Sequence, residues 1–210
     1  MIRRTKAVYT RPNTSVKFRD IAGMVGMDQE LIQRKIHKNM SFSEDWLTRT
    51  MVIEFDLAED ESYKQMMERH KDAREADHRR RVANGIHVTY TEDIVEKYTD
   101  IPTNRGPNRR ILKLITTRPN TNVLFHDHAN SVGFNNEYHD LPVDVDVTFS
   151  EDFLTRTRVS SYDLKYEPII NELKERFKHE LDTEYQRQVR DGITNTMYDI
   201  TDENNPIKLF

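Results

Sequence analysis

The chain contains no cysteine, and only six of its 210 residues are glycine. The lack of cysteine excludes a disulfide framework, thiol catalysis and a cysteine-ligated zinc site. Gly-rich phosphate loops, the G-x-S-x-G nucleophile elbow, the H-E-x-x-H helix and the EF-hand loop are also missing from the sequence. The sequence therefore predicts a protein that is not an enzyme and that carries no cofactor.

Long apolar runs and an excess of positive charge are absent as well. No stretch approaches the roughly 20 apolar residues of a membrane helix, and the start MIRRTKAVYTRP lacks the apolar core of a signal peptide. A net charge of -4 and a pI near 6.1 argue against general binding to nucleic acids, which requires clustered cations. We therefore expect no membrane partner, no general nucleic-acid binding and no secretion by a signal peptide.

Two near-identical nonapeptides, TRPNTSVKF from Thr10 and TRPNTNVLF from Thr117, stand 107 residues apart. At that offset, 33 of the 88 positions from Arg3 to Tyr90 are identical without a gap. The identities cluster in TRPNT, FSED, LTRT and a closing V-x-x-G-I. Such self-similarity at a fixed offset predicts a tandem duplication.

The duplication divides the chain into four parts. The first repeat is 1–93, the linker is 94–108, the second repeat is 109–200 and the C-terminal tail is 201–210. Pro102, Gly106 and Pro107 mark the linker, because proline and glycine interrupt regular structure. Each repeat of about 100 residues is large enough to bury a core of its own.

Both repeats predict the same order of elements. A β-branched and aromatic strand at 6–10 ends at a proline turn, and hairpins at 40–55 and 144–162 surround a Ser-Glu-Asp turn. A long helix with one apolar face follows each hairpin, and Gly85 and Gly192 close it before a last strand. The segment at 28–36 is helical in pattern, whereas Pro142 makes its counterpart a poor helix.

The resulting order, β-(α)-β-β-α-β, is that of the ferredoxin-like fold. An α+β protein built from two such repeats, packed with pseudo-two-fold symmetry, resembles the dimeric α+β barrel group. In that group, ferredoxin-like units pack sheet against sheet, and some members are monooxygenases or haem-handling proteins. The resemblance implies a ligand site in the apolar space between sheet and helices.

The motifs FSED-x-L-T-R-T and A-N-G-I resemble in style the small proteins of tailed bacteriophages. That resemblance implies a virion component, such as a minor head, neck or tail protein. Its location would be the virion or the host cytoplasm, and its partners would be other protein subunits of the assembly.

Arg11 and Arg118 are the residues of the TRPNT motif whose charged side chains could bind another group in addition to shaping the turn. They are candidate contacts for a partner or an anion at a strand end. The alternative is a purely structural strand exit, fixed by proline and by side-chain hydrogen bonds to the turn backbone. Glu44 and Asp45 of the Ser-Glu-Asp turn would need burial and a raised pKa to act as acid and base. Because such a turn is normally exposed, we assign no catalytic residue.

His126 and His128, in the segment FHDHAN, are candidate metal ligands because alternate residues of a strand share a face. The first repeat has Arg19 and Ile21 at the equivalent positions, so a metal site would be new to one repeat. The spacing is not that of a known metal motif, and we predict no metal site.

The tail TDENNPIKLF is polar with an apolar end. If it is ordered, that end should dock on a neighbouring surface, either of this chain or of a partner. Ile207, Leu209 and Phe210 are therefore candidate partner-binding residues.

Two functions from different classes remain open. The first is a structural or interaction protein of a larger assembly. The second is a small-molecule-binding protein, or a monooxygenase-like enzyme, of the α+β barrel kind. A cavity with convergent polar groups would favour the second function, and a filled space between sheet and helices would favour the first.

Overall fold

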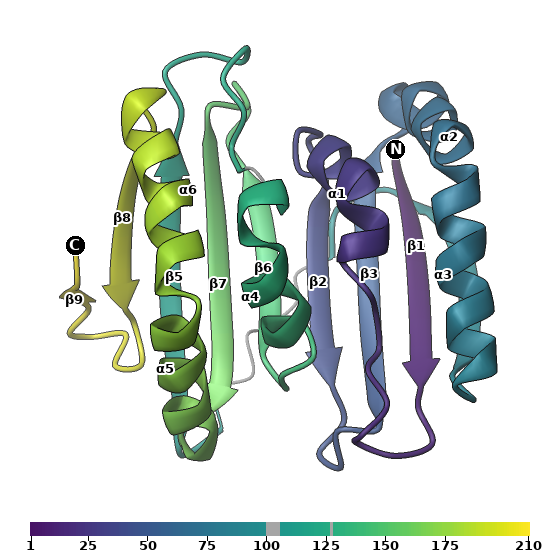
Figure 1. The fold of residues 1–210 in the computed structure, drawn as a ribbon. Helices are drawn as coiled ribbons and strands as arrows, with labels where there is room; N and C mark the ends of the chain where they lie inside the picture. The colour runs from purple at the N-terminus through teal and green to yellow at the C-terminus, as the bar shows by residue number, and fades with distance from the viewer. Residues whose placement is uncertain (100–105, 127) are drawn as a thin grey trace.

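A computed structural model describes residues 1–99, 106–126 and 128–210 of the chain. In these ranges the fold is α+β, with one antiparallel sheet of nine strands and six α-helices (Figure 1). Pro102 of the expected linker lies outside the described residues.

The strands are β1 (Ile2–Thr10), β2 (His37–Phe42), β3 (Thr48–Asp56), β4 (His87–Val95), β5 (Arg109–Thr117), β6 (Asp144–Phe149), β7 (Thr155–Asp163), β8 (Thr194–Asp199) and β9 (Ile207–Lys208). The helices are α1 (Val25–Leu31), α2 (Asp60–Arg69), α3 (Lys71–Ala83), α4 (Val132–Tyr138), α5 (Glu167–Arg176) and α6 (Lys178–Arg190). Short 3₁₀ turns precede α1, α2, α4 and α5, and the one before α4, called η3, is His128–Ser131.

The strand order across the sheet is β4-β1-β3-β2-β6-β7-β5-β8-β9. Within the first half of the chain it reads β4-β1-β3-β2, and the second half runs β8-β5-β7-β6 from its outer strand inward. The two sets meet where β2 pairs with β6, with Lys38 opposite Val147 and Met40 opposite Val145. The sheet-against-sheet packing implied by the barrel resemblance is therefore wrong. The strands join edge to edge, which pairs backbone groups that an edge strand would leave unsatisfied.

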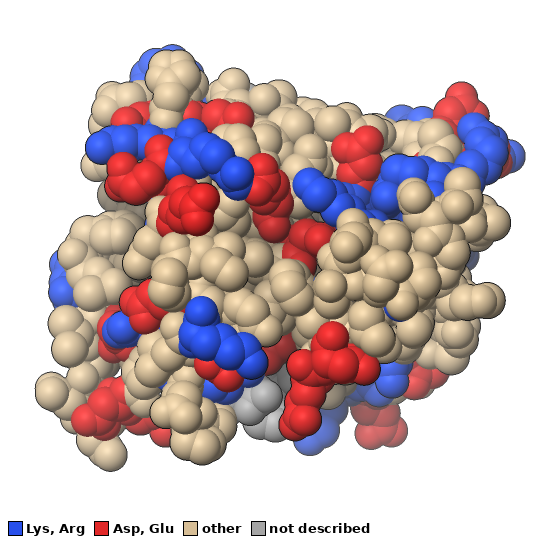
Figure 2. Space-filling view, turned by 60° about the horizontal axis from the view of Figure 1, so that its bottom comes forward, with Lys and Arg blue, Asp and Glu red and all other residues tan. Residues whose placement is uncertain are grey.

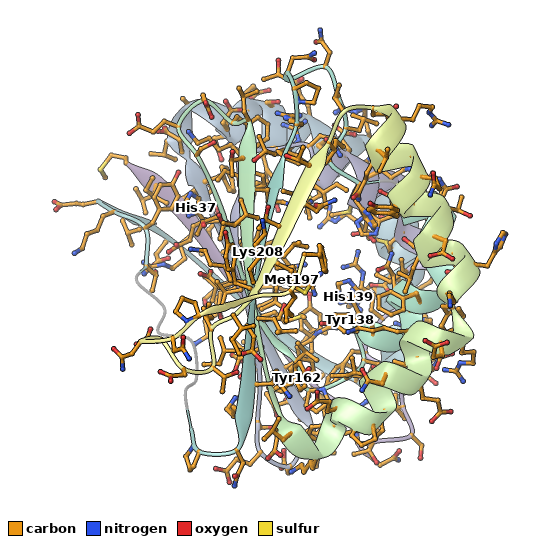
Figure 3. The ribbon with its side chains drawn as sticks, turned by 90° about the vertical axis from the view of Figure 1, so that its left-hand side faces the viewer. His37, Tyr138, His139, Tyr162, Met197 and Lys208 are labelled. Atoms are coloured by element: carbon orange, nitrogen blue, oxygen red, sulfur yellow. The ribbon has the colours of Figure 1, made fainter. Side chains whose placement is uncertain are left out.

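All six helices lie on one face of the sheet, as Figures 1 and 3 show. Tyr138 and His139 are on the helix side in Figure 3, whereas His37 is on the opposite side. The alternation of side chains along β2 explains this placement, because His37 points away from the helices and Lys38, its neighbour, points toward them. On the open face, the ring of Tyr98 stacks on His37 with the ring centroids 3.8 Å apart.

The predicted hairpins and strand exits are confirmed, but the helices differ from expectation. Each long helix is two helices, which meet at His70 in the first half and at Phe177 in the second. The second half also contains a helix before its hairpin, since α4 ends before Pro142 and the proline does not interrupt it.

Gly85 and Gly192 close α3 and α6 as predicted, both with φ of +73°. Ile86 donates its backbone N–H to the carbonyl of Arg81, and Ile193 donates to Gln188, as in a Schellman motif. A Cβ added at Gly85 would lie 3.5 Å from Cγ of Pro12, and one at Gly192 would lie 3.5 Å from Cγ of Pro119. The TRPNT corner and the helix stop are thus packed together, which gives a physical reason why both occur in each half.

Charged side chains of both signs lie next to one another on the face shown in Figure 2. Such mixing produces little net field for attracting a nucleic-acid backbone. In the part of the chain that the structure describes, no helix is long and apolar enough to cross a membrane.

Candidate functional site

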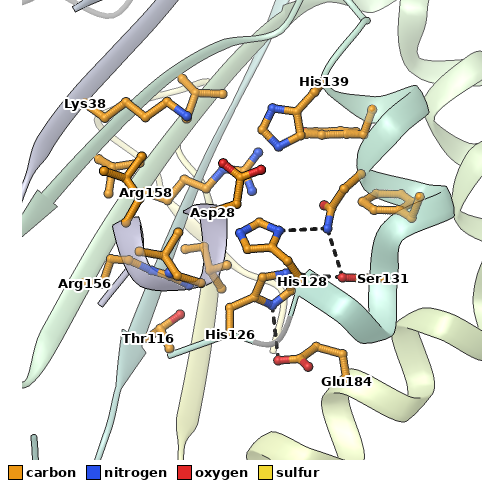
Figure 4. A pocket seen from close by; sticks show the side chains of 18 of the residues that line it. Asp28, Lys38, Thr116, His126, His128, Ser131, His139, Arg156, Arg158 and Glu184 are labelled. Atoms are coloured by element: carbon orange, nitrogen blue, oxygen red, sulfur yellow. Dashed lines mark hydrogen bonds and ion pairs between the residues drawn. The ribbon is translucent and has the colours of Figure 1, made fainter. Parts of the chain in front are cut away.

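A cavity of about 380 Å³ lies between the helix-covered face of the sheet and the helices (Figure 4). Its volume is in the range that holds small organic molecules. Tyr185 of α6 and Phe210 of the tail line it and are both more than half exposed. The cavity therefore reaches solvent between α6 and the C-terminal strand.

The floor of the cavity consists of two rows of cross-strand neighbours. The first row, from β2 to β8, is Lys38, Val147, Arg158, Leu114 and Met197. The second row, from β6 to β8, is Phe149, Arg156, Thr116 and Asn195. Both rows face the helices because residues two apart on a strand share a face.

The roof comes from α1, η3, α4 and α6. Its apolar members are Leu31, Phe134, Tyr138 and Leu181, and its polar members include Asp28, His128, Ser131, Asn135, Glu184 and Gln188. The cavity wall is therefore apolar over much of its area, with polar groups at a few positions.

Lys38, Arg156 and Arg158, here called the cation cluster, line the floor of the cavity (Figure 4). No residue that the structure describes forms a hydrogen bond or ion pair with the side chain of any of the three. Arg156 lies over the ring of Phe125 and Arg158 over that of Tyr138, at 5.1 and 5.3 Å from the ring centroids. The Nε atom of Arg158 is buried and has no partner among the described groups.

The lowered pKa values of the cation cluster indicate that its positive charges destabilise the folded protein. Burial, with the neighbouring Arg158, lowers the pKa of Arg156 to about 10. Burial, with the neighbouring Arg19, lowers the pKa of Lys38 to about 8. Positive charge is thus held in a partly desolvated space with no carboxylate of the described residues in an ion pair with it, which is normally unfavourable.

The two carboxylates of the cavity wall are already engaged. Asp28 is bound to Arg19 in an ion pair. Burial alone would raise the pKa of Glu184, but hydrogen bonds from His126, Arg187 and Gln188 outweigh it and lower that pKa to about 2. Glu184 is therefore ionised and hydrogen-bonded to these donors. Glu184 favours the charge of Arg156 and Asp28 favours that of Lys38, but burial outweighs both effects and neither carboxylate forms an ion pair with the cluster.

Two histidines in the cavity are neutral at physiological pH. Burial lowers the pKa of His128 to about 2, with His126 adding to the effect, and burial places the pKa of His139 well below its usual value. The side-chain amide of Asn135 donates to Nδ1 of His128 at 3.1 Å, which leaves the proton of the neutral ring on Nε2. These rings offer hydrogen bonds to a ligand but contribute no charge.

The two candidate metal ligands lie side by side, with their ring centroids 4.6 Å apart. Nδ1 of His126 is 3.1 Å from Oε1 of Glu184, and Nε2 is 3.3 Å from the hydroxyl of Ser131. Within the described ranges, no group of three histidine or carboxylate side chains is arranged to hold a metal ion.

Arg11 and Arg118 are buried, with exposures of 1% and 2%. The guanidinium of Arg118 donates to the carbonyls of Phe153, Thr121 and Val123. That of Arg11 donates to two carbonyls in the same way and also binds Asp140 at 3.3 Å. Both side chains fasten the strand exit to the hairpin turn, so an outside partner could reach them only if the turn opened.

In both halves, the side chains of the Ser-Glu-Asp turn form hydrogen bonds within the turn. Asp45 accepts hydrogen bonds from Ser43 and from the backbone of Leu47, and these lower the pKa of its carboxyl. Asp152 has the same bonds from Ser150 and Leu154, with the same effect on its pKa. A carboxyl that is exposed and held ionised does not serve as a general acid near neutral pH.

The apolar tail docks on the sheet of its own chain. β9 pairs with β8, and Met197 exchanges backbone hydrogen bonds with Leu209 and Phe210 at 2.8 and 3.0 Å. The side chains of Ile207, Leu209 and Phe210 remain about half exposed. Their role in binding a partner stays a prediction.

At two positions that line the cavity in the second half, the first half has larger side chains. Tyr9 is buried in the first half, with the guanidinium carbons of Arg49 and Arg81 4.8 and 4.9 Å from its ring centroid. At the equivalent positions, 107 residues later, the second half has Thr116 and Gln188. Two large side chains are thereby replaced by smaller ones, and both replacements line the cavity.

Sequence reasoning missed all three residues of the cation cluster. The available signal was a difference between the two halves at the 107-residue offset: Lys38 aligns with Val145, and Arg158 aligns with Met51. A cation on the helix-facing side of a strand, where the aligned position of the other half has an apolar residue, indicates a specialised position.

Comparisons with known proteins yield only distant similarities. No protein-family model matches the sequence, and no curated protein matches it significantly. Among solved structures, the chain is similar to CrmK, a flavoenzyme involved in shunt product recycling in caerulomycin biosynthesis (8% identity, TM-score 0.41). It is also similar to GilR, an oxidoreductase that catalyses the terminal step of gilvocarcin biosynthesis (8%, 0.38), and to the VAO-type flavoprotein MtVAO615 from Myceliophthora thermophila C1 (9%, 0.39).

These matches cover 84%, 84% and 87% of this chain but only 41%, 42% and 38% of the three proteins. The chain thus spans about two fifths of their length. At TM-scores below 0.5 the similarities carry no conclusion about function, which has to be argued from the cavity.

Proposed function

We propose that this protein binds a small organic acid in the cavity between the sheet and the helices. The observation that carries the proposal is the cation cluster, three positive side chains without a carboxylate partner among the described residues. An anion placed among them would supply the missing counter-charge inside a low-dielectric space. The apolar wall suits the organic body of such a ligand.

The most direct test of the proposal compares the binding of acids with that of alcohols of matched shape. We expect 3-phenylpropionate and octanoate to bind and to raise the melting temperature, and 3-phenylpropanol and octanol to bind at least about ten-fold more weakly. The physical reason is that only the acids compensate buried charge, and such pairs contribute about 1.5 kcal/mol or more. Isothermal titration calorimetry at low ionic strength measures the four dissociation constants.

Variants distinguish recognition of the ligand's carboxylate from nonspecific hydrophobic binding. Arg158→Gln should weaken the binding of both acids at least about ten-fold and leave the alcohols unchanged. The control is Lys6→Gln, which alters an exposed strand residue on the open face of the sheet. Equal affinities for acids and alcohols, or no binding of any of the four, would overturn the proposal.

We also infer that the two halves of the chain are ferredoxin-like repeats related by pseudo-two-fold symmetry. The matching strand orders support this, and so does a reciprocal contact between the halves. The backbone N–H of Phe18 donates to Asp140 of the other half at 2.9 Å, and that of Phe125 donates to Gln33 at 3.1 Å. Phe18 and Phe125 are equivalent at the 107-residue offset, and so are Gln33 and Asp140.

The second candidate function is that of a subunit in a larger assembly, with the virion setting resting on motif style alone. The observation that favours it is the exposure of Ile207 on the outermost strand, β9, and of Leu209 and Phe210, which follow it. An edge strand with apolar side chains is a template for pairing with another chain.

Deleting residues 205–210 is expected to weaken incorporation into such an assembly. Co-sedimentation of the tagged protein with particles from its native source would measure the effect. Changing Lys208 to Glu, which keeps the apolar side chains, is the matched control. Undiminished incorporation of the deletion variant would rule out a role for the tail.

A further inference from the structure

Lys38 occupies a central position on the cavity floor. It belongs to the row that crosses the junction of β2 and β6, and only Val147 separates it from Arg158 along that row. With strands roughly 4.8 Å apart, the Cα atoms of Lys38 and Arg158 are about 10 Å apart, within reach of two long side chains. Figure 4 shows Lys38 extending into the cavity from the sheet, with His139 on the opposite side.

The surroundings of Lys38 favour its uncharged amine. Burial lowers its pKa to about 8, and Arg19, Arg49 and Arg158 act in the same direction, while Asp28 opposes them. His128 and His139 also face the amine from the roof, and both are neutral. An ordinary lysine at neutral pH is almost entirely protonated and is not a nucleophile, whereas desolvation beside other cations releases the amine.

We propose that Lys38 is a nucleophilic amine that captures a 2-oxo acid as an imine within the cavity. This inference rests on the proposed binding of organic acids, and it names the class of acid. In a 2-oxo acid the carbonyl carbon is bonded directly to the carboxylate carbon. A carboxylate held by Arg156 and Arg158 therefore brings the carbonyl to the side of the floor where Lys38 lies.

The chemistry balances without an oxidant, a metal or a second substrate. The lone pair of the amine forms a bond from Nζ to the carbonyl carbon, and the carbonyl oxygen takes up a proton from the nitrogen. The resulting carbinolamine breaks its C–O bond. The oxygen leaves as water with the second amine proton, and a C=N bond remains.

The test compares phenylpyruvate with phenyllactate, which keeps the carboxylate and ring but has a hydroxyl in place of the carbonyl. Each acid is incubated with the full-length protein and sodium cyanoborohydride at pH 7.5, and the modified lysines are identified by peptide mass spectrometry. We expect phenylpyruvate to label Lys38 at least about ten-fold faster than any other of the twelve lysines. Phenyllactate should bind without labelling.

Two variants sharpen this test. Lys38→Met should abolish the rapid labelling, and Lys6→Met, on the open face of the sheet, should leave it unchanged. Binding of both acids with no adduct at Lys38 would overturn the imine and leave the proposed function intact. Adducts spread evenly over the lysines would overturn the imine as well.

A second probe keeps the inference falsifiable if neither acid binds, an outcome that would count against the proposed function. Formaldehyde with cyanoborohydride methylates amines through an imine and needs no recognition by the cavity. At pH 7.5 Lys38 should be methylated ahead of the other eleven lysines, along with the N-terminal amine, whose ordinary pKa is about 8. A rate at Lys38 no greater than that of exposed lysines would refute a nucleophilic role.

Discussion

Replacing Arg118 with methionine is expected to lower the free energy of unfolding by about 3 kcal/mol. Methionine keeps much of the side-chain volume but removes every donor. The carbonyls of Phe153, Thr121 and Val123 would then lose their partner inside the protein. The stacking of the guanidinium on Phe125 and Phe153, at 4.3 and 4.5 Å from the ring centroids, would also be lost.

Urea denaturation at pH 7, followed by circular dichroism, measures this loss. Arg118→Lys should have an intermediate effect, because lysine retains the charge but not the planar fork of donors. Arg190→Met is the control, since the side chain of Arg190 is 74% exposed and its ion pair with Asp191 is a surface contact. A loss for Arg118→Met as small as that of the control would show that the buried guanidinium does not hold the corner.

Replacing Lys38 with methionine is expected to raise the free energy of unfolding by about 1–3 kcal/mol at pH 7. Most substitutions of buried residues destabilise a protein, so the sign of this change is diagnostic. The stabilisation arises because an ammonium ion without a carboxylate partner among the described residues is removed from a desolvated site. The thioether chain also fills the same space at little cost.

The effect should depend on pH in a direction that follows from the lowered pKa. In the folded protein the pKa of Lys38 is about 8, below the usual value of 10.5 for a lysine side chain. Between these two values the unfolded chain binds more protons than the folded one, so this group makes the wild type more stable as pH rises. The advantage of Lys38→Met should therefore be largest below pH 8 and shrink toward pH 10.5.

Measuring the difference between variant and wild type removes the contribution of other groups that titrate in this range, such as Tyr9 and Tyr162. Lys6→Met, the control, should show no such pH dependence. If Lys38→Met were destabilising to the same extent at pH 7 and pH 10, Lys38 would be an ordinary structural residue.

A stabilising change that also removes ligand binding is typical of a functional site, where uncompensated charge is retained for binding at the expense of stability. The buried arginines of the TRPNT corner and the cation cluster thus differ in kind. The former donate hydrogen bonds to acceptors of their own chain, and the side chains of the latter have no such partner among the described residues. That difference is why Arg118→Met and Lys38→Met are expected to change stability in opposite directions.

The sequence alone determined the strand exits, the hairpins and the helix stops, but it did not predict α4 or β9. The proline exits, the Ser-Glu-Asp hairpin turns and the helix stops at Gly85 and Gly192 all depend on local backbone chemistry, so their residues can be read directly. The alternation in β6 likewise predicted a strand with one buried face. The sequence around His70 and Phe177 contains no comparable local signal that each long helix is divided there.

Only the tertiary structure decided how the halves meet and where the cavity lies. Pairing of β2 with β6 depends on which sheet edges are left free, and no local pattern encodes that choice. The same pairing aligns Lys38 with Arg158 across three strands, although the two residues are 120 positions apart in sequence. In the sequence alone, a cation at position 38 has no special significance. It becomes a candidate site because the continuous sheet places it near a second cation, beneath the helices.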